Sequence, residues 1–170
     1  MKHLAKLFAA AAALVIAAPA VATPLSASPP AEAKALIIFP LTLTKLDDLS
    51  FGTIVPSSVS GVVTVPADGS APFASGGVTL LPSDPGLRAQ FVGAGTANQT
   101  VLINVVNPVT LGNGLGDTVT VLALTLDGSP IRTIDSTRAL FFHVGGVLLV
   151  GANQPEGIYQ SDFDVTAQYL

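Results

Sequence analysis

Polar and apolar residues alternate along the last stretch of the chain, from Gly157 to Leu170. Polar residues hold the even positions from Gln160 to Gln168, and odd positions carry Tyr159, Phe163, Val165, Ala167 and Tyr169. A period of two is typical of a strand with one buried face. Because the pattern continues to the last two residues, we expect the C-terminus to be part of the fold and to take part in an interface.

A second apolar stretch begins at Lys34 with the sequence KALIIFPLTLTKL. Alternation predicts a strand whose first face carries Ala35, Ile37, Phe39, Leu41 and Leu43. Its second face is also apolar, at Leu36 and Ile38, and Pro40 has no N–H to donate. These features favour a strand that lies at an edge or changes partners.

Short apolar segments follow one another through the rest of the chain, separated by turn signals such as Asp68-Gly69, Asn113-Gly114 and Asp127-Gly128. No helical period of useful length is present. Eight to ten short strands of this kind predict an all-β fold, an antiparallel immunoglobulin-like β-sandwich. A small barrel is the alternative.

The N-terminus has the pattern of a secretory signal peptide, with Lys2 and Lys6 before an apolar run and Ala20-Val21-Ala22 as the cleavage site. A transmembrane anchor is the alternative, but the run is nearer about 12 residues than 20. We therefore expect residues 1–22 to be removed and the protein to be exported to the periplasm, then to the cell surface or medium. No other segment is long and apolar enough to span a bilayer.

After the cleavage site, residues 23–33 have only small or apolar side chains apart from Glu32, and two adjacent prolines, Pro29 and Pro30. Such a segment favours neither a ladder nor a helix. We expect an extended N-terminal arm over residues 23–35 and a single β-sandwich domain over residues 36–170.

Composition narrows the possible partners. The expected mature chain has five scattered basic residues against eleven acidic ones, a net charge of about −6, which attracts neither nucleic acid nor anionic lipid. Cysteine and tryptophan are absent, so stability depends on packing rather than on disulfides. A β-rich chain with so few charges tends to associate.

Candidate chemistry is sparse. His143 is the only histidine after the expected cleavage site, and no serine has the surroundings of a nucleophile elbow. The carboxylate pairs Asp47-Asp48 and Asp162 with Asp164 fit solvated positions, and the glycine-rich segment LGNGLGDT fits a hairpin turn better than a calcium or phosphate loop. We expect no enzyme activity, no cofactor and no metal.

Four segments together resemble the bacterial domain-of-unknown-function family 4402. They are PLTLTKLDDLSFGTI (residues 40–54), GGVTLL (76–81), HVGGVLLVGANQPEGIY (143–159) and DVTAQY (164–169). The resemblance covers essentially residues 36–170 and implies an exported β-rich domain.

The C-terminus is also similar, more distantly, to the final strand of chaperone-usher pilins and spore-coat-U-like fimbrial subunits. That similarity implies that Tyr159, Phe163, Val165 and Tyr169 contact a periplasmic chaperone or a neighbouring subunit. It also implies that the N-terminal arm is the donor strand, with Leu25, Ala35, Ile37 and Phe39 as candidate donor or edge residues. An outer-membrane usher is a further implied partner.

These observations favour a non-enzymatic, pilin-like structural subunit that assembles with copies of itself by β-strand complementation. The alternative is a monomeric periplasmic or surface binding module, an adhesin for carbohydrate or protein. An enzyme is the third hypothesis, with His143 as its most plausible catalytic group.

Overall fold

The computed structural model describes residues 23–108 and 110–170, so the expected signal peptide lies outside the described residues. The chain divides between Leu36 and Ile37. Residues 23–36 contain no strand and bend at Ser28 and Pro29. All the strands lie in the second unit, Ile37–Leu170.

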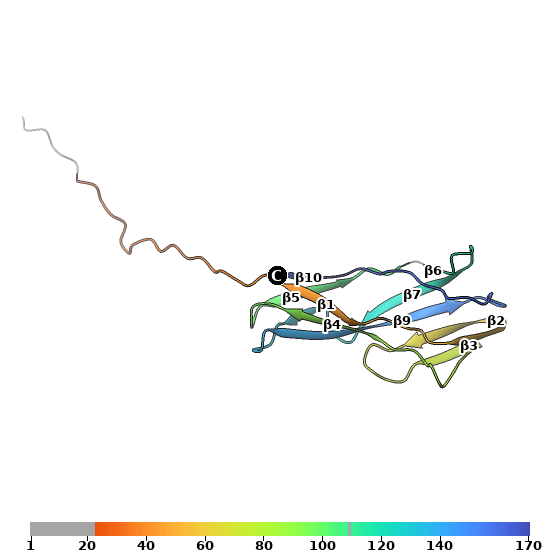
Figure 1. The fold of residues 1–170 in the computed structure, drawn as a ribbon. Helices are drawn as coiled ribbons and strands as arrows, with labels where there is room; N and C mark the ends of the chain where they lie inside the picture. The colour runs from red at the N-terminus through yellow and green to blue at the C-terminus, as the bar shows by residue number, and fades with distance from the viewer. Residues whose placement is uncertain (1–22, 109) are drawn as a thin grey trace, which may run out of the picture. The chain divides into compact units, whose positions relative to one another are not determined.

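This second unit is built from strands alone (Figure 1). In the part of the chain that the structure describes there are ten strands and no helix: β1 (Thr42–Asp47), β2 (Ile54–Val65), β3 (Phe73–Leu80), β4 (Ala89–Ala94), β5 (Thr100–Val105), β6 (Thr110–Gly112), β7 (Thr118–Leu126), β8 (Ile131–Thr133), β9 (Ala139–Val150) and β10 (Val165–Tyr169).

The strands form two antiparallel sheets. The larger sheet has seven strands, ordered β1-β4-β9-β2-β3 with β7 and β6 beside β9, and the smaller sheet is β10-β5-β8. The all-β, sandwich-like fold predicted from the sequence is thereby confirmed. An immunoglobulin-like order of connections stays a prediction.

Strand β9 is the centre of the larger sheet. Its first half pairs with β4, its second half pairs with β2, and its opposite edge pairs with β7. A strand with neighbours on both edges and cover on its inner face needs many apolar side chains. The sequence ALFFHVGGVLLV supplies them, and Phe142, Val144, Leu148 and Val150 are buried.

Two apolar clusters make up the core. The first cluster includes Phe142, whose ring stacks on Phe91 at a centroid distance of 5.3 Å, together with Val101 and Ile103 of β5. The second cluster includes Val121 of β7 and Leu148 of β9 and lies on the half of the larger sheet near β2 and β3. Only the first cluster contains buried residues of the smaller sheet.

The structure corrects the start of the first strand. Alternation predicts a strand from Lys34, but β1 begins at Thr42, and its partner β4 ends opposite it at Ala94. Residues 34–41 therefore have no strand to pair with, and Pro40 has no N–H to donate to a neighbouring strand. The edge position predicted for this strand is confirmed.

The terminal alternation also appears as predicted. Strand β10 pairs with β5, its odd residues are half-buried, and its even residues are exposed. The segment LGNGLGDT forms the predicted hairpin turn between β6 and β7, where the Asn113 side chain accepts hydrogen bonds from the N–H groups of Leu115 and Asp117.

Candidate functional site

The last eleven residues form one long edge of the domain. Gln160 exchanges two backbone hydrogen bonds with Gly112 of β6, Asp164 accepts one from Val106, and Leu170 donates one to Thr100 of β5. No turn or bend interrupts residues 160–169. The extended stretch that lies along β6 and β5 is therefore longer than strand β10.

The backbone hydrogen bonds just described all come from even-numbered residues of this edge: Gln160, Asp164 and Leu170. In an extended chain, successive residues direct their N–H and C=O groups to opposite sides. The backbone groups of Phe163 and Val165 therefore point away from β5. No described strand pairs with this side of β10, so it is a free edge.

The four residues predicted for the interface have their side chains turned inward. Phe163, Val165 and Tyr169 pack against the first core cluster, and Tyr159 packs against the second. These side chains belong to the domain's own core. The groups that remain accessible to a partner are therefore the backbone N–H and C=O groups on the unpaired side of the segment. The predicted contact with a chaperone or a neighbouring subunit stays a prediction.

An open cleft of about 1110 Å³ runs beside this edge. Residues 154–165 form one wall, and residues 48–54 with Leu43 and Lys45 of β1 form the other. Its floor consists of side chains from the larger sheet: Phe91, Val119, Val121, Leu124, Leu148 and Val150. The core of the domain is thus covered here by two loop segments rather than by a strand.

The rim of the cleft is acidic. Glu156, Asp162 and Asp164 line it and are exposed, and Lys45, on the opposite wall, forms an ion pair with Asp48. Within the described residues, the three carboxylates of the first wall take part in no ion pair. The cleft therefore combines an apolar floor with a negative rim.

The N-terminal candidate residues are exposed. Leu25 is 100% exposed, Ile37 93% and Phe39 56%, and Ala35 is exposed as well. None of them lies in a strand. Their predicted role as donor or edge residues stays a prediction.

Phe39 is the point at which the chain joins the sandwich. Its N–H donates to the Thr96 hydroxyl (2.7 Å), and its C=O accepts from the Tyr169 hydroxyl (2.9 Å). The Arg138 guanidinium lies 4.4 Å from the centre of its ring, a cation–π contact. The C-terminus consequently lies beside the start of β1 (Figure 1).

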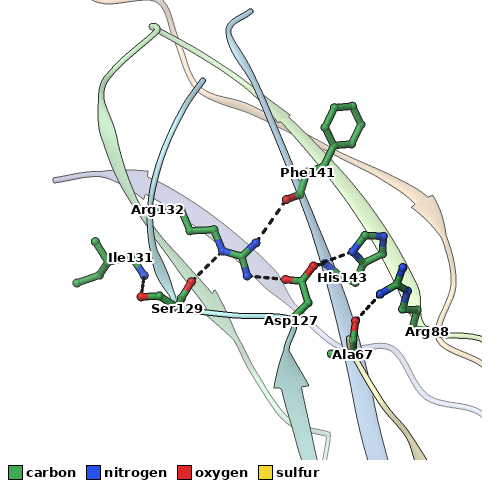
Figure 2. A network of polar contacts seen from close by, with 8 residues as sticks. All are labelled: Ala67, Arg88, Asp127, Ser129, Ile131, Arg132, Phe141 and His143. Carbon is green, nitrogen blue, oxygen red and sulfur yellow. Dashed lines mark hydrogen bonds and ion pairs between the residues drawn. The ribbon is translucent and has the colours of Figure 1, made fainter. Parts of the chain in front are cut away.

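A polar network that sequence reasoning missed joins the two sheets (Figure 2). Asp127, after β7, accepts hydrogen bonds from Arg132 of β8 and from the Nδ1 atom (2.7 Å) and backbone N–H (3.0 Å) of His143 of β9. Arg132 also donates to the carbonyls of Ser129 and Phe141. Only the turn signal Asp127-Gly128 marked this position in the sequence.

Electrostatics keep Asp127 ionised. Burial favours the neutral acid, but the hydrogen bonds and charges of Arg132 and His143 outweigh it and hold the pKa of the Asp127 carboxyl below its ordinary value of 3.8. Because an ionised carboxylate only accepts, His143 carries its proton on Nδ1. Neither Asp127 nor His143 lines the cleft.

Other chemistry is not apparent in the described residues. Over residues 23–108 and 110–170, no group of three or more His, Cys, Asp or Glu side chains is placed to hold a metal ion. No helix in the same residues is long and apolar enough to cross a membrane.

These features define an all-β sandwich domain in which the unpaired edge of β10 lies beside an open cleft. The chain belongs to the family described as a domain of unknown function, DUF4402, whose model matches residues 41–169. The match begins just before β1 and ends at the last residue of β10, so it includes both walls of the cleft. No curated protein and no solved structure matches the chain.

Proposed function

We propose that the protein is a non-enzymatic structural subunit, exported to the periplasm and then the cell surface, that assembles with copies of itself by β-strand complementation. One observation carries this proposal: residues 160–165, the first part of the unpaired edge, line a cleft whose floor is the core of the domain.

Both features are costly to leave open. An unpaired strand edge presents N–H and C=O groups that bind other strands. The floor of the cleft is apolar and nearly buried, with Leu148 and Val150 3% and 4% exposed, but loop segments rather than a strand cover it. An added strand remedies both, because its backbone pairs with the edge while alternate side chains cover the floor.

The pilin-like part of the proposal comes from the sequence. A signal peptide over residues 1–22 would deliver the chain to the periplasm, and a chaperone would occupy the open edge there until a second copy replaces it. An outer-membrane usher would then guide assembly at the surface.

The arrangement of polar groups favours a role other than catalysis. His143, the most plausible catalytic residue, is held by Asp127 in a network that links strands β7, β8 and β9. His143 is not among the side chains that line the cleft, so the most plausible acid–base group lies outside it.

Light scattering of two purified forms tests the proposal. The form covering residues 23–170 should give oligomers whose mass grows with concentration, and the form beginning at Ile37, which keeps every strand, should stay monomeric. Adding a peptide of residues 23–39 to the shorter form should raise its melting temperature, because the peptide fills the cleft. Stable monomers from both forms, with no response to the peptide, would exclude strand complementation.

The second candidate, a monomeric binding module, uses the same cleft. Tyr159 is the one tyrosine that lines it, and its hydroxyl already contacts Gln154 and Pro155. A monomer that gives a saturable signal on a glycan or protein array would favour this candidate.

A further inference from the structure

The proposed function leaves open which part of a second copy enters the cleft. We propose that the entering strand is residues 34–38, with the sequence KALII, and that residues 23–33 contribute nothing to binding. This inference rests on the proposed function and narrows it to one segment of the partner copy.

Apolar exposure singles out this segment. Leu36 is 77% exposed and Ile37 93%, and both lie outside every strand. In residues 23–33, by contrast, Leu25 is the only large apolar side chain, and Pro29-Pro30 lacks two N–H groups. Residues 34–38 therefore have both the side chains to cover an apolar floor and the backbone donors to form a ladder.

The length of the segment suits the cleft. Five extended residues span roughly 17 Å. The free wall of the cleft, from Gln160 to Val165, is itself extended and of nearly the same length. A short strand of this kind pairs with the wall along most of that distance.

Charge also favours this segment. Lys34 precedes the apolar residues, and within residues 23–108 and 110–170 its only ion pair is with Glu32, where both side chains are largely exposed. Such a surface pair contributes little and is readily exchanged. The rim carboxylates Glu156 and Asp162 present negative charge to an entering strand, so Lys34 matches the cleft that it enters.

The segment is attached to the domain at a fixed point. Residues 37–41 contain neither turn nor bend. Phe39 is held on both its N–H and its C=O, by Thr96 and Tyr169. Residues 34–38 therefore directly precede an anchored residue.

The test compares two sets of substitutions in the full 23–170 form. Leu36→Ser with Ile37→Ser should weaken assembly, lowering the association constant at least tenfold. Leu25→Ser is the matched control and should assemble like the unmodified chain. Circular dichroism should report the same fold for all three, because the substituted residues are exposed.

The outcomes separate this inference from the proposed function. If the unmodified chain assembles and the double variant assembles equally well, the inference is wrong while strand complementation survives. Loss of assembly in Leu25→Ser overturns the boundary at residue 34, because the earlier part of the arm then contributes. A monomeric unmodified chain overturns the proposed function and this inference together.

Lys34→Glu gives an independent measurement. It keeps the apolar residues and places a negative charge opposite the acidic rim, so assembly should weaken severalfold at low salt and recover as salt screens the repulsion. Assembly that is unchanged at every salt concentration contradicts the placement of Lys34 at this rim.

Discussion

The hydroxyl of Tyr169 holds together two ends of the domain that are 130 residues apart in sequence. It accepts a hydrogen bond from the N–H of Thr96 (2.7 Å) and donates one to the C=O of Phe39 (2.9 Å). The penultimate residue thus fixes the point at which the chain enters β1.

Replacing Tyr169 with Phe removes this link. We expect the free energy of unfolding to fall by about 1–2 kcal/mol, because the Thr96 N–H loses its partner in a part-buried position. Urea unfolding measures the change. Tyr159→Phe is the matched control and should cost less, because its acceptor Pro155 is exposed and can bind water instead, and its donor Gln154 keeps a hydrogen bond to the Thr118 carbonyl. Equal losses in the two variants would contradict this assignment.

Asp127 is the second residue with a large expected effect. Its folded-state pKa lies below the unfolded value, so it contributes stability above about pH 4 that is lost as the pH falls through the lower, folded value. Asp127→Asn should lower the free energy of unfolding at pH 7 by about 1–3 kcal/mol and flatten the decline in acid. Urea unfolding between pH 3 and pH 7 tests both effects. Asp162 is exposed, so Asp162→Asn is the control and should change neither the free energy of unfolding at pH 7 nor its decrease in acid. If the free energy of unfolding of Asp127→Asn decreases in acid as steeply as that of the unmodified chain, the assignment is wrong.

Sequence reasoning found some side-chain roles and missed others for a physical reason. The inward direction of Phe163 and Val165 follows from a local period of two, which is visible in the sequence. The contacts of Asp127 with Arg132 and His143 depend on how three separate strands are placed, and no local pattern encodes that placement.

At the scale of the elements, β9 depends on close approach by its neighbour β2. A Cβ on Gly145 would overlap the carbonyl oxygen of Val65 at the end of β2. Gly145→Ala should therefore destabilise the domain by about 1–3 kcal/mol, through overpacking between backbones that cannot easily shift. Thermal unfolding measures the change.

Gly112 provides the control for this substitution. A Cβ there would meet only the Asp117 carbonyl oxygen, at 3.9 Å, which is ordinary contact. Gly112→Ala should stay within about 1 kcal/mol of the unmodified protein. If Gly145→Ala is equally harmless, β2 and β9 do not approach as closely as described.

The elements themselves were largely predictable, with one informative exception. Alternation and turn signals predicted the number and type of strands, and the terminal strand in particular. The stretch from Lys34 to Leu41 has an equally good strand pattern, yet it forms no strand because β4 ends opposite Thr42. A pattern of side chains predicts the capacity to pair, whereas pairing also requires a neighbour; the second copy proposed above would supply one.

At the scale of the whole molecule, the proposal joins two incomplete parts: an exposed apolar segment without a partner strand and a cleft without a covering strand. The cleft could not be predicted from the sequence, because its walls come from residues 43–54 and 154–165 and its floor from β4, β7 and β9. The sequence predicts that the end of the chain takes part in an interface, and the proposed assembly places that interface at the unpaired edge of β10.

Hydrogen exchange at single amides, followed by NMR, tests the central claim most directly. In the form beginning at Ile37, the amides of Thr166 and Gln168 should be protected, because they face β5, while those of Phe163 and Val165 should exchange rapidly. In the assembled 23–170 form, Phe163 and Val165 should become protected, with Thr166 and Gln168 as internal controls. Rapid exchange at Phe163 and Val165 in the assembled form would contradict the account, because the free edge would then be unpaired in the assembly.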